Sequence, residues 1–249
     1  MQTISRLRTA AALACSLLLM LACTTHIKQN PSAAEIESVG MLANNTQQPE
    51  ALQTLTVWAQ QGNIIASREL GNALAGNTGR QIEALHWLRQ AAEGGDRAAQ
   101  FSLAEVNYKG RLGSPQNYAQ AWQWYWAASR QQHNKASLML SRMCKYGEGV
   151  PLDINQSVQW LQTASDQGNA QAMFLLSNAY ASGEGVKTDP LLANLWLERA
   201  AEGDFPVAIQ ALAMELSGQP EIKDQDPQRA RHLLKEATDE RKMRWNQYQ

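Results

Sequence analysis

The sequence predicts an all-α protein, a right-handed α-solenoid of about five helix-turn-helix repeats preceded by a partial N-terminal half-repeat. Two independent landmarks recur with one period. An alanine is followed four residues later by a leucine, as in Ala136 and Leu140. A large side chain recurs every 36 or 37 residues, at Trp87, Trp124, Trp160, Trp196 and Leu233. Unrelated landmarks that share a period indicate stacked repeats, in which each unit buries its apolar face against its neighbours.

Residues 1–22 are predicted to be a signal peptide. Arg6 and Arg8 precede an apolar run from Ala10 to Leu21, which is shorter than the roughly 20 residues that span a bilayer. The run ends in Leu21-Ala22-Cys23, which resembles the lipobox of bacterial lipoproteins, although Met20 stands where leucine is usual. The resemblance implies that Cys23 is acylated and becomes the first mature residue. The alternative is an ordinary cleaved signal with an incidental cysteine.

The residue after Cys23 bears on the membrane in which the anchor would lie. It is Thr24 rather than the aspartate that the resemblance associates with retention in the inner membrane. We therefore expect the periplasmic face of the outer membrane. Residues 23–49 are predicted to be the lipidated cysteine and a polar tether, because they are rich in Asn, Gln, Thr and Ser and lack a sustained apolar stripe.

The repeat domain is predicted to cover 50–249. A half-repeat at 50–63 precedes five units and a C-terminal cap, and the units are approximately 64–96, 97–133, 134–169, 170–204 and 205–240. The first helix of each unit carries the alanine–leucine pair and is expected to end at a glycine such as Gly147 or Gly183. The second helix is expected to begin after a capping residue, at Asn117, Asp153, Asp189 and Asp226.

Two segments make the resemblance to a known family specific. They are Leu176–Val186, with the sequence LSNAYASGEGV, and Ala193–Gly203, with the sequence ANLWLERAAEG. Both resemble Sel1-like repeats, which are relatives of the tetratricopeptide repeat. The resemblance implies a scaffold or adaptor that works between proteins.

The landmark residues are interpreted as the structural core of the repeats. One large ring in each unit, opposite alanines at fixed spacing, fills the space between stacked helix pairs. This interpretation covers Trp87, Trp124, Trp160, Trp196 and Leu233. Cys144 follows its leucine by four residues, at the position that Tyr180 has in the next repeat, and is expected to be a buried small apolar residue.

One stripe of side chains is unusual enough to be a candidate binding site. Its members are spaced by four along the second helix of the second unit, at Tyr118, Trp122, Trp126 and Arg130. Two residues before the landmark position, two of the other units carry the apolar residues Leu85 and Val158 and two carry Asn194 and Arg231, so Trp122 is expected to pack partly between repeats. The position of Trp126 is polar in the other units, so this indole is expected to be at least partly exposed. Exposed Trp, Tyr and Arg are typical of interface hot spots.

No catalytic or metal-binding pattern is found. The 22 Lys and Arg residues balance 23 Asp and Glu, which gives no electrostatic indication of nucleic-acid binding. The histidines of the mature chain are scattered, and no paired motif for a metal ion is present. We expect no enzyme activity, no cofactor and no metal.

We therefore expect an outer-membrane-anchored periplasmic lipoprotein that acts as a protein–protein scaffold or adaptor in an envelope assembly, such as export, pilus or secretion machinery. Its partners would be envelope proteins, and the membrane through the lipid anchor. The alternative is a protein that binds peptidoglycan or sugar, or a cell-wall enzyme, using the Tyr118/Trp122/Trp126 surface. If Cys23 is not acylated, a secreted adaptor becomes the third possibility.

Overall fold

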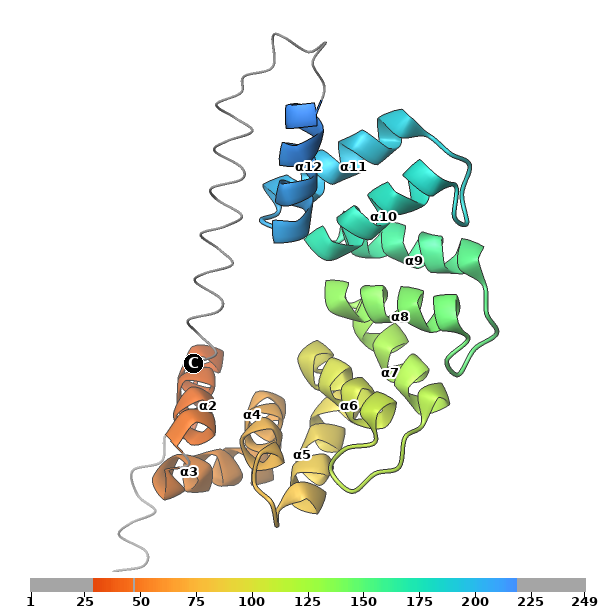
Figure 1. Cartoon of the computed structure of the whole chain (residues 1–249). Helices are drawn as coiled ribbons and strands as arrows, with labels where there is room; N and C mark the ends of the chain where they lie inside the picture. Colours follow the sequence, from red (N-terminus) through yellow and green to blue (C-terminus); the bar gives the residue numbers. More distant parts are fainter. Residues whose placement is uncertain (1–28, 47, 219–249) are drawn as a thin grey trace, which may run out of the picture. The chain divides into compact units, whose positions relative to one another are not determined.

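The computed structural model describes residues 29–46 and 48–218, with side chains up to residue 214, and all regular elements in these ranges are helices (Figure 1). The eleven helices of the described ranges are α2 (Ala33–Thr46), α3 (Pro49–Gln60), α4 (Ile64–Ala75), α5 (Gln81–Glu93), α6 (Arg97–Lys109), α7 (Tyr118–Arg130), α8 (Asn134–Tyr146), α9 (Ile154–Asp166), α10 (Ala170–Ser182), α11 (Pro190–Glu202) and α12 (Pro206–Gly218). The chain divides into two compact units, Met1–Trp87 and Leu88–Gln249. The all-α repeat fold is therefore confirmed.

Capping groups set the helix ends where the sequence predicts them. The Asn117 and Asp153 side chains accept hydrogen bonds from the backbone N–H three residues later, at 3.0 and 2.9 Å. Asp189 caps α11 in the same way, and Pro190 is the first residue of that helix. At the other end, Gly147 and Gly183 close α8 and α10 with φ of 70° and 78°, a left-handed conformation that only glycine adopts without steric cost. Asp226 lies outside the described residues.

In the first unit, the expectation of a polar tether over 33–46 is wrong, because this segment forms α2. The helix packs against α3 and α4 and buries Ile36, Gly40 and Ala43. A Cβ atom at Gly40 would lie within 2.9 Å of the Glu69 side chain, so glycine is what permits the close approach of α2 to α4. The buried face holds one large apolar residue and two small ones, and such a narrow stripe is not visible as an apolar periodicity.

The half-repeat that the sequence predicts at 50–63 is the helix α3, which completes a helix pair with α2. Leu55 and Trp58 of α3 are buried. The Arg68 guanidinium of α4 forms an ion pair with Glu37 of α2 at 2.8 Å. The packed part of the first unit therefore begins about one helix earlier than the sequence indicates.

In the second unit, α6 to α12 follow one another along an arc, and each packs against the next (Figure 1). The predicted alanine–leucine pairs of the first helices form the centre of this core, with Ala136, Leu140, Ala172 and Leu176 fully buried. Small residues at these positions let neighbouring helices approach closely. The buried positions of the first helices therefore recur with the period seen in the sequence.

The landmark tryptophans lie at the edge of this core rather than at its centre. Trp196 is buried, but Trp87, Trp124 and Trp160 are only half-buried. In α5, α7 and α9 the buried residue is instead the one after the landmark, at Leu88, Tyr125 and Leu161, whereas in α11 both Trp196 and Leu197 are buried. One residue is about 100° of rotation around a helix. Trp160 and Trp196 accordingly lie against the preceding repeat, where Trp160 meets Trp122 of α7 and Trp196 packs with Val158 of α9. Leu233 lies outside the described residues.

Candidate functional site

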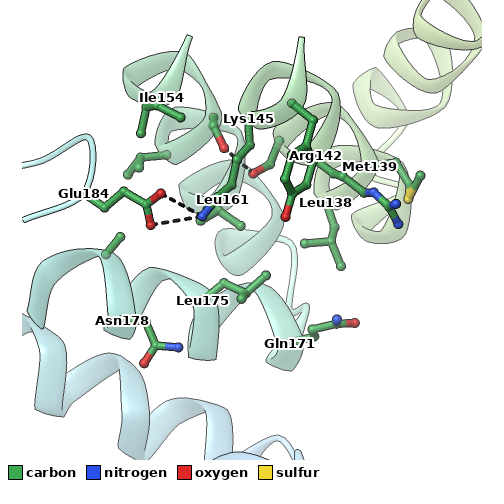
Figure 2. A pocket seen from close by; sticks show the side chains of 15 residues that line it. Leu138, Met139, Arg142, Lys145, Ile154, Leu161, Gln171, Leu175, Asn178 and Glu184 are labelled. Atoms are coloured by element: carbon green, nitrogen blue, oxygen red, sulfur yellow. Dashed lines mark hydrogen bonds and ion pairs between the residues drawn. The ribbon is translucent and has the colours of Figure 1, made fainter. Parts of the chain in front are cut away.

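A groove lies in the second unit. It has a volume of about 620 Å³ and lies between the first helices of two successive repeats, α8 and α10 (Figure 2). Its floor is the intervening helix α9, which contributes Ile154, Val158 and Leu161. Because α9 packs against both α8 and α10, it holds the two walls apart and closes the bottom of the groove.

Corresponding positions of two repeats make up the two walls. Met139 and Arg142 of α8 correspond, 36 residues later, to Leu175 and Asn178 of α10. The residues that point into the core, such as Leu140 and Leu176, are their direct neighbours in sequence. Stacking of the repeats in register therefore brings the two pairs of side chains to opposite sides of one groove. The wall is part apolar and part polar, since Leu175 is 38% exposed and Asn178 beside it carries a free amide face.

An ion pair stands at one end of the groove. Lys145 of α8 contacts both carboxylate oxygens of Glu184, in the loop after α10, at 2.8 and 3.0 Å (Figure 2). The corresponding glutamate one repeat earlier is Glu148, which accepts a hydrogen bond of 2.6 Å from the hydroxyl of Tyr108 in α6. Burial, and then this hydrogen bond, raise the pKa of Tyr108. The glutamate of the Gly-Glu-Gly-Val loop thus joins its repeat to the preceding one in both cases.

Arg142 is the cation in the groove that lacks such a close partner. Its guanidinium lies over the rings of Tyr108 and Tyr146, 5.7 and 5.9 Å from their centroids. Its Nε is 4.0 Å from Glu148, whose oxygen is already bonded to Tyr108. The Arg142 side chain is 55% exposed, and none of its N–H groups donates a hydrogen bond to another described residue.

The predicted stripe of α7 separates into a packed half and an exposed half. Tyr118 contacts Tyr108 with ring centroids 5.2 Å apart, and Trp122 meets Trp160 edge-on at 6.2 Å. The Tyr118 contact lies within one repeat, whereas Trp122 belongs to the packing between repeats, as expected. Trp126 is 44% exposed, as its position indicates, and the Arg130 guanidinium lies 4.9 Å from the centroid of its ring.

The exposed half of the stripe borders a second, shallower pocket of about 400 Å³. It is lined by Trp122, Gln123, Trp124, Trp126 and Ala127. Indole rings and one amide surround this space, and no carboxylate lines it. The pocket can therefore offer flat apolar surface and hydrogen bonds, but its lining supplies no acid or base.

Sequence reasoning missed the groove at α8 and α10. Its side chains vary from repeat to repeat, as Glu105, Arg142 and Asn178 do at one position, so no repeated motif marks them. The signal that could have found the groove is this variation. The core positions keep alanine and leucine in the units, so a nearby position that changes residue type in every unit does not belong to the repeated core.

Several other titratable groups of the second unit have structural roles. The hydroxyl of Tyr125 donates to Glu105, as that of Tyr108 does to Glu148, so both carboxylates are committed to tyrosines. Cys144 is a buried free thiol, and burial raises its pKa to about 11. It donates to the Oε1 atom of Gln156 at 3.4 Å. The thiol is therefore a packing residue, as the sequence predicts.

Metal sites and membrane spans are considered for the described ranges only. No group of three or more His, Cys, Asp or Glu side chains is close enough there to hold a metal ion. None of the helices in 29–46 and 48–218 is both long and apolar enough to traverse a bilayer. Cys23 and the predicted signal peptide lie outside these ranges.

Solved structures with a similar fold include the following two. A Sel1 repeat protein from Oxalobacter formigenes is 26% identical, with a TM-score of 0.72, over 85% of this chain and 91% of that one. The protein c5321, described as a protective antigen of uropathogenic Escherichia coli strains, is 22% identical with a TM-score of 0.68, over 84% of this chain. This chain spans only 46% of c5321, so that likeness concerns the fold. No curated protein matches the sequence.

The family model of the Sel1 repeat matches five consecutive segments. They are residues 70–96, 97–133, 134–169, 170–205 and 206–240, which together make up more than half of the chain. The matches agree with the alanine–leucine period and with the capping residues of the described helices. The resemblance that the sequence indicates is confirmed: this chain belongs to the Sel1 repeat family, with five repeats.

Proposed function

We propose that this protein is a lipid-anchored periplasmic scaffold of the outer membrane, which binds proteins of an envelope assembly such as export, pilus or secretion machinery. Sel1 repeat proteins typically mediate protein–protein interactions. The observation that carries the proposal for this chain is the open groove between α8 and α10. It presents apolar side chains beside amide and charged groups, without a buried set of titratable residues.

The chemistry of the groove suits an extended polypeptide. Such a segment exposes backbone N–H and C=O groups along its length and alternates its side chains between two faces. The amides of Gln171 and Asn178 can donate to and accept from that backbone, and neither is bonded to another described side chain. Met139 and Leu175 offer apolar contact between the polar groups.

The proposed anchor rests on the sequence. Cys23 follows an apolar run with a small residue before it, and several acyl chains, at about 0.8 kcal/mol for each buried CH₂ group, give a lasting attachment to a membrane. Cells grown with a palmitate analogue should incorporate it into the wild-type protein but not into Cys23→Ser. Release of the wild-type protein into the soluble periplasmic fraction, without label, would contradict the anchor.

Site-specific crosslinking in intact cells tests the scaffold. A photoreactive amino acid at Leu175, in the groove, should give discrete adducts with an envelope protein. The matched control is the same amino acid at Leu191, which is highly exposed on α11 but lies outside the groove. Adducts at Leu175 should disappear when Asn178 and Met139 are both changed to alanine. Equal adducts at both sites would show that the groove is not the binding surface.

A second candidate function, binding of a cell-wall sugar, is favoured by the pocket beside Trp126. Flat indole faces stack on sugar rings, and the Gln123 amide can bond to hydroxyl groups. Because the lining has no carboxylate pair, the pocket supports binding rather than glycoside hydrolysis. Soluble peptidoglycan fragments should then change the tryptophan fluorescence of the wild type and not that of Trp126→Ala. No change in the wild type would reject this candidate.

A further inference from the structure

The groove carries an excess positive charge at one defined place. Three charged side chains line it, Arg142, Lys145 and Glu184. Lys145 and Glu184 neutralise each other across 2.8 Å. Arg142 remains, and its nearest carboxylate, Glu148, approaches only Nε, at 4.0 Å. Arg142 lines the groove, and its two terminal nitrogens have no carboxylate within 4.0 Å among the described residues.

Two aromatic rings lie near this charge. The guanidinium carbon is 5.7 Å from the ring centroid of Tyr108 and 5.9 Å from that of Tyr146, within the range of a cation–π contact. The Arg142 side chain is 55% exposed, so it is accessible to a ligand. A planar guanidinium can bind the two oxygens of a carboxylate in a bidentate pair.

We propose that the groove selects an extended partner segment with an internal Asp or Glu side chain, whose carboxylate pairs with Arg142 while a neighbouring apolar side chain lies between Met139 and Leu175. This inference rests on the proposed scaffold function. An internal carboxylate fits better than a chain end, because the wall continues past Arg142 on both sides. Met139 lies one turn before it and Tyr146 one turn after it, and a chain that ended at Arg142 would leave one of them uncovered.

The test is a selection of short random peptide segments, displayed with fixed sequences at both ends so that no free carboxyl terminus is present. The bait is the full-length chain as wild type, Arg142→Glu and Arg142→Gln. Arg89→Glu is the matched control, because it changes the net charge equally at an exposed arginine on α5, outside the groove. Circular dichroism and melting curves establish that each variant is folded.

The wild type should enrich segments with an acidic residue next to an apolar one. Arg142→Glu should enrich Lys or Arg at that position instead, and Arg89→Glu should behave as the wild type. Replacing the acidic residue of an enriched peptide by its amide should weaken binding to the wild type about tenfold, and this difference should vanish in Arg142→Gln. The tenfold difference should also shrink as the salt concentration rises.

The outcomes separate this inference from the function on which it rests. An acidic preference that persists in Arg142→Glu would overturn the role of Arg142. Enrichment of apolar segments without acidic residues would also overturn the role of Arg142. In that case, loss of binding in Leu175→Lys would still support the groove as a binding site. A library with free carboxyl termini that binds more tightly than the internal one would refute an internal carboxylate. Absence of any enrichment would contradict both proposals.

Discussion

Replacing Trp196 by alanine tests how the repeats are held together. Trp196 is only 6% exposed and packs in the cluster of α9, α10 and α11 with Val158 and Leu176. A buried indole removes about 200 Å² from water, which corresponds to about 5 kcal/mol at about 25 cal/mol per Å². The methyl group that alanine retains reduces this by about 1 kcal/mol. We therefore expect a loss of about 3–5 kcal/mol in the free energy of unfolding.

The matched variant is Trp126→Ala on α7. Trp126 is 44% exposed, so it buries about half as much surface and should cost half the Trp196 value or less. Urea unfolding, followed by circular dichroism, gives both free energies. Hydrogen exchange locates the effect, which should concentrate in α9 to α11, because each repeat contacts only its neighbours. Equal losses for the two variants would refute the assignment of Trp196 to the core and Trp126 to the surface.

Three further predictions concern titratable groups of the second unit. The Nδ1 atom of His133 caps α8 at 3.3 Å, and burial lowers its pKa, so the unfolded chain binds the proton more readily. The free energy of unfolding should thus fall as the pH drops through about 6.5, by up to about 1 kcal/mol. The variant His133→Asn, which copies the cap at Asn169, should abolish this pH dependence in melting curves. Cys144, with its pKa raised to about 11, should react with a thiol reagent at pH 8 only in denaturant, and fast labelling of the native protein would contradict its burial. Tyr108→Phe should cost about 1 kcal/mol of unfolding free energy by leaving Glu148 without its donor, whereas an unchanged urea midpoint would show that the bond contributes nothing.

The repeat fold could be predicted from the sequence because the same packing positions recur in every repeat. The pair formed by Ala136 and Leu140 recurs because every first helix buries the same two positions against its neighbours. The caps at Asn117 and Asp153 are equally visible, because the chemistry of a helix end is local. The tryptophans show the limit of this reasoning. A period gives the spacing of a landmark, but the angle at which it meets the core depends on the neighbouring repeat.

The groove could not be predicted, because the residues that line its walls do not follow the repeated pattern of the core. Arg142 and Asn178 hold the same position in successive repeats and share no chemistry. Their meeting across one cavity follows from the register of α8 and α10, which only the three-dimensional structure provides. The α7 stripe could be found because it is rich in aromatic residues, yet half of it is packing. Helix α2 could not be recognised from the sequence because its buried face consists of one large apolar residue, Ile36, and two small residues, Gly40 and Ala43.

Hydrogen exchange of the full-length protein with and without a selected peptide tests the central claim most directly. The account predicts slower exchange on binding in α8 and α10, the two walls of the groove, and little change at the exposed end of α7. Protection centred on α7 around Trp126, with α8 and α10 unchanged, would contradict the groove as the surface through which this protein binds its partners.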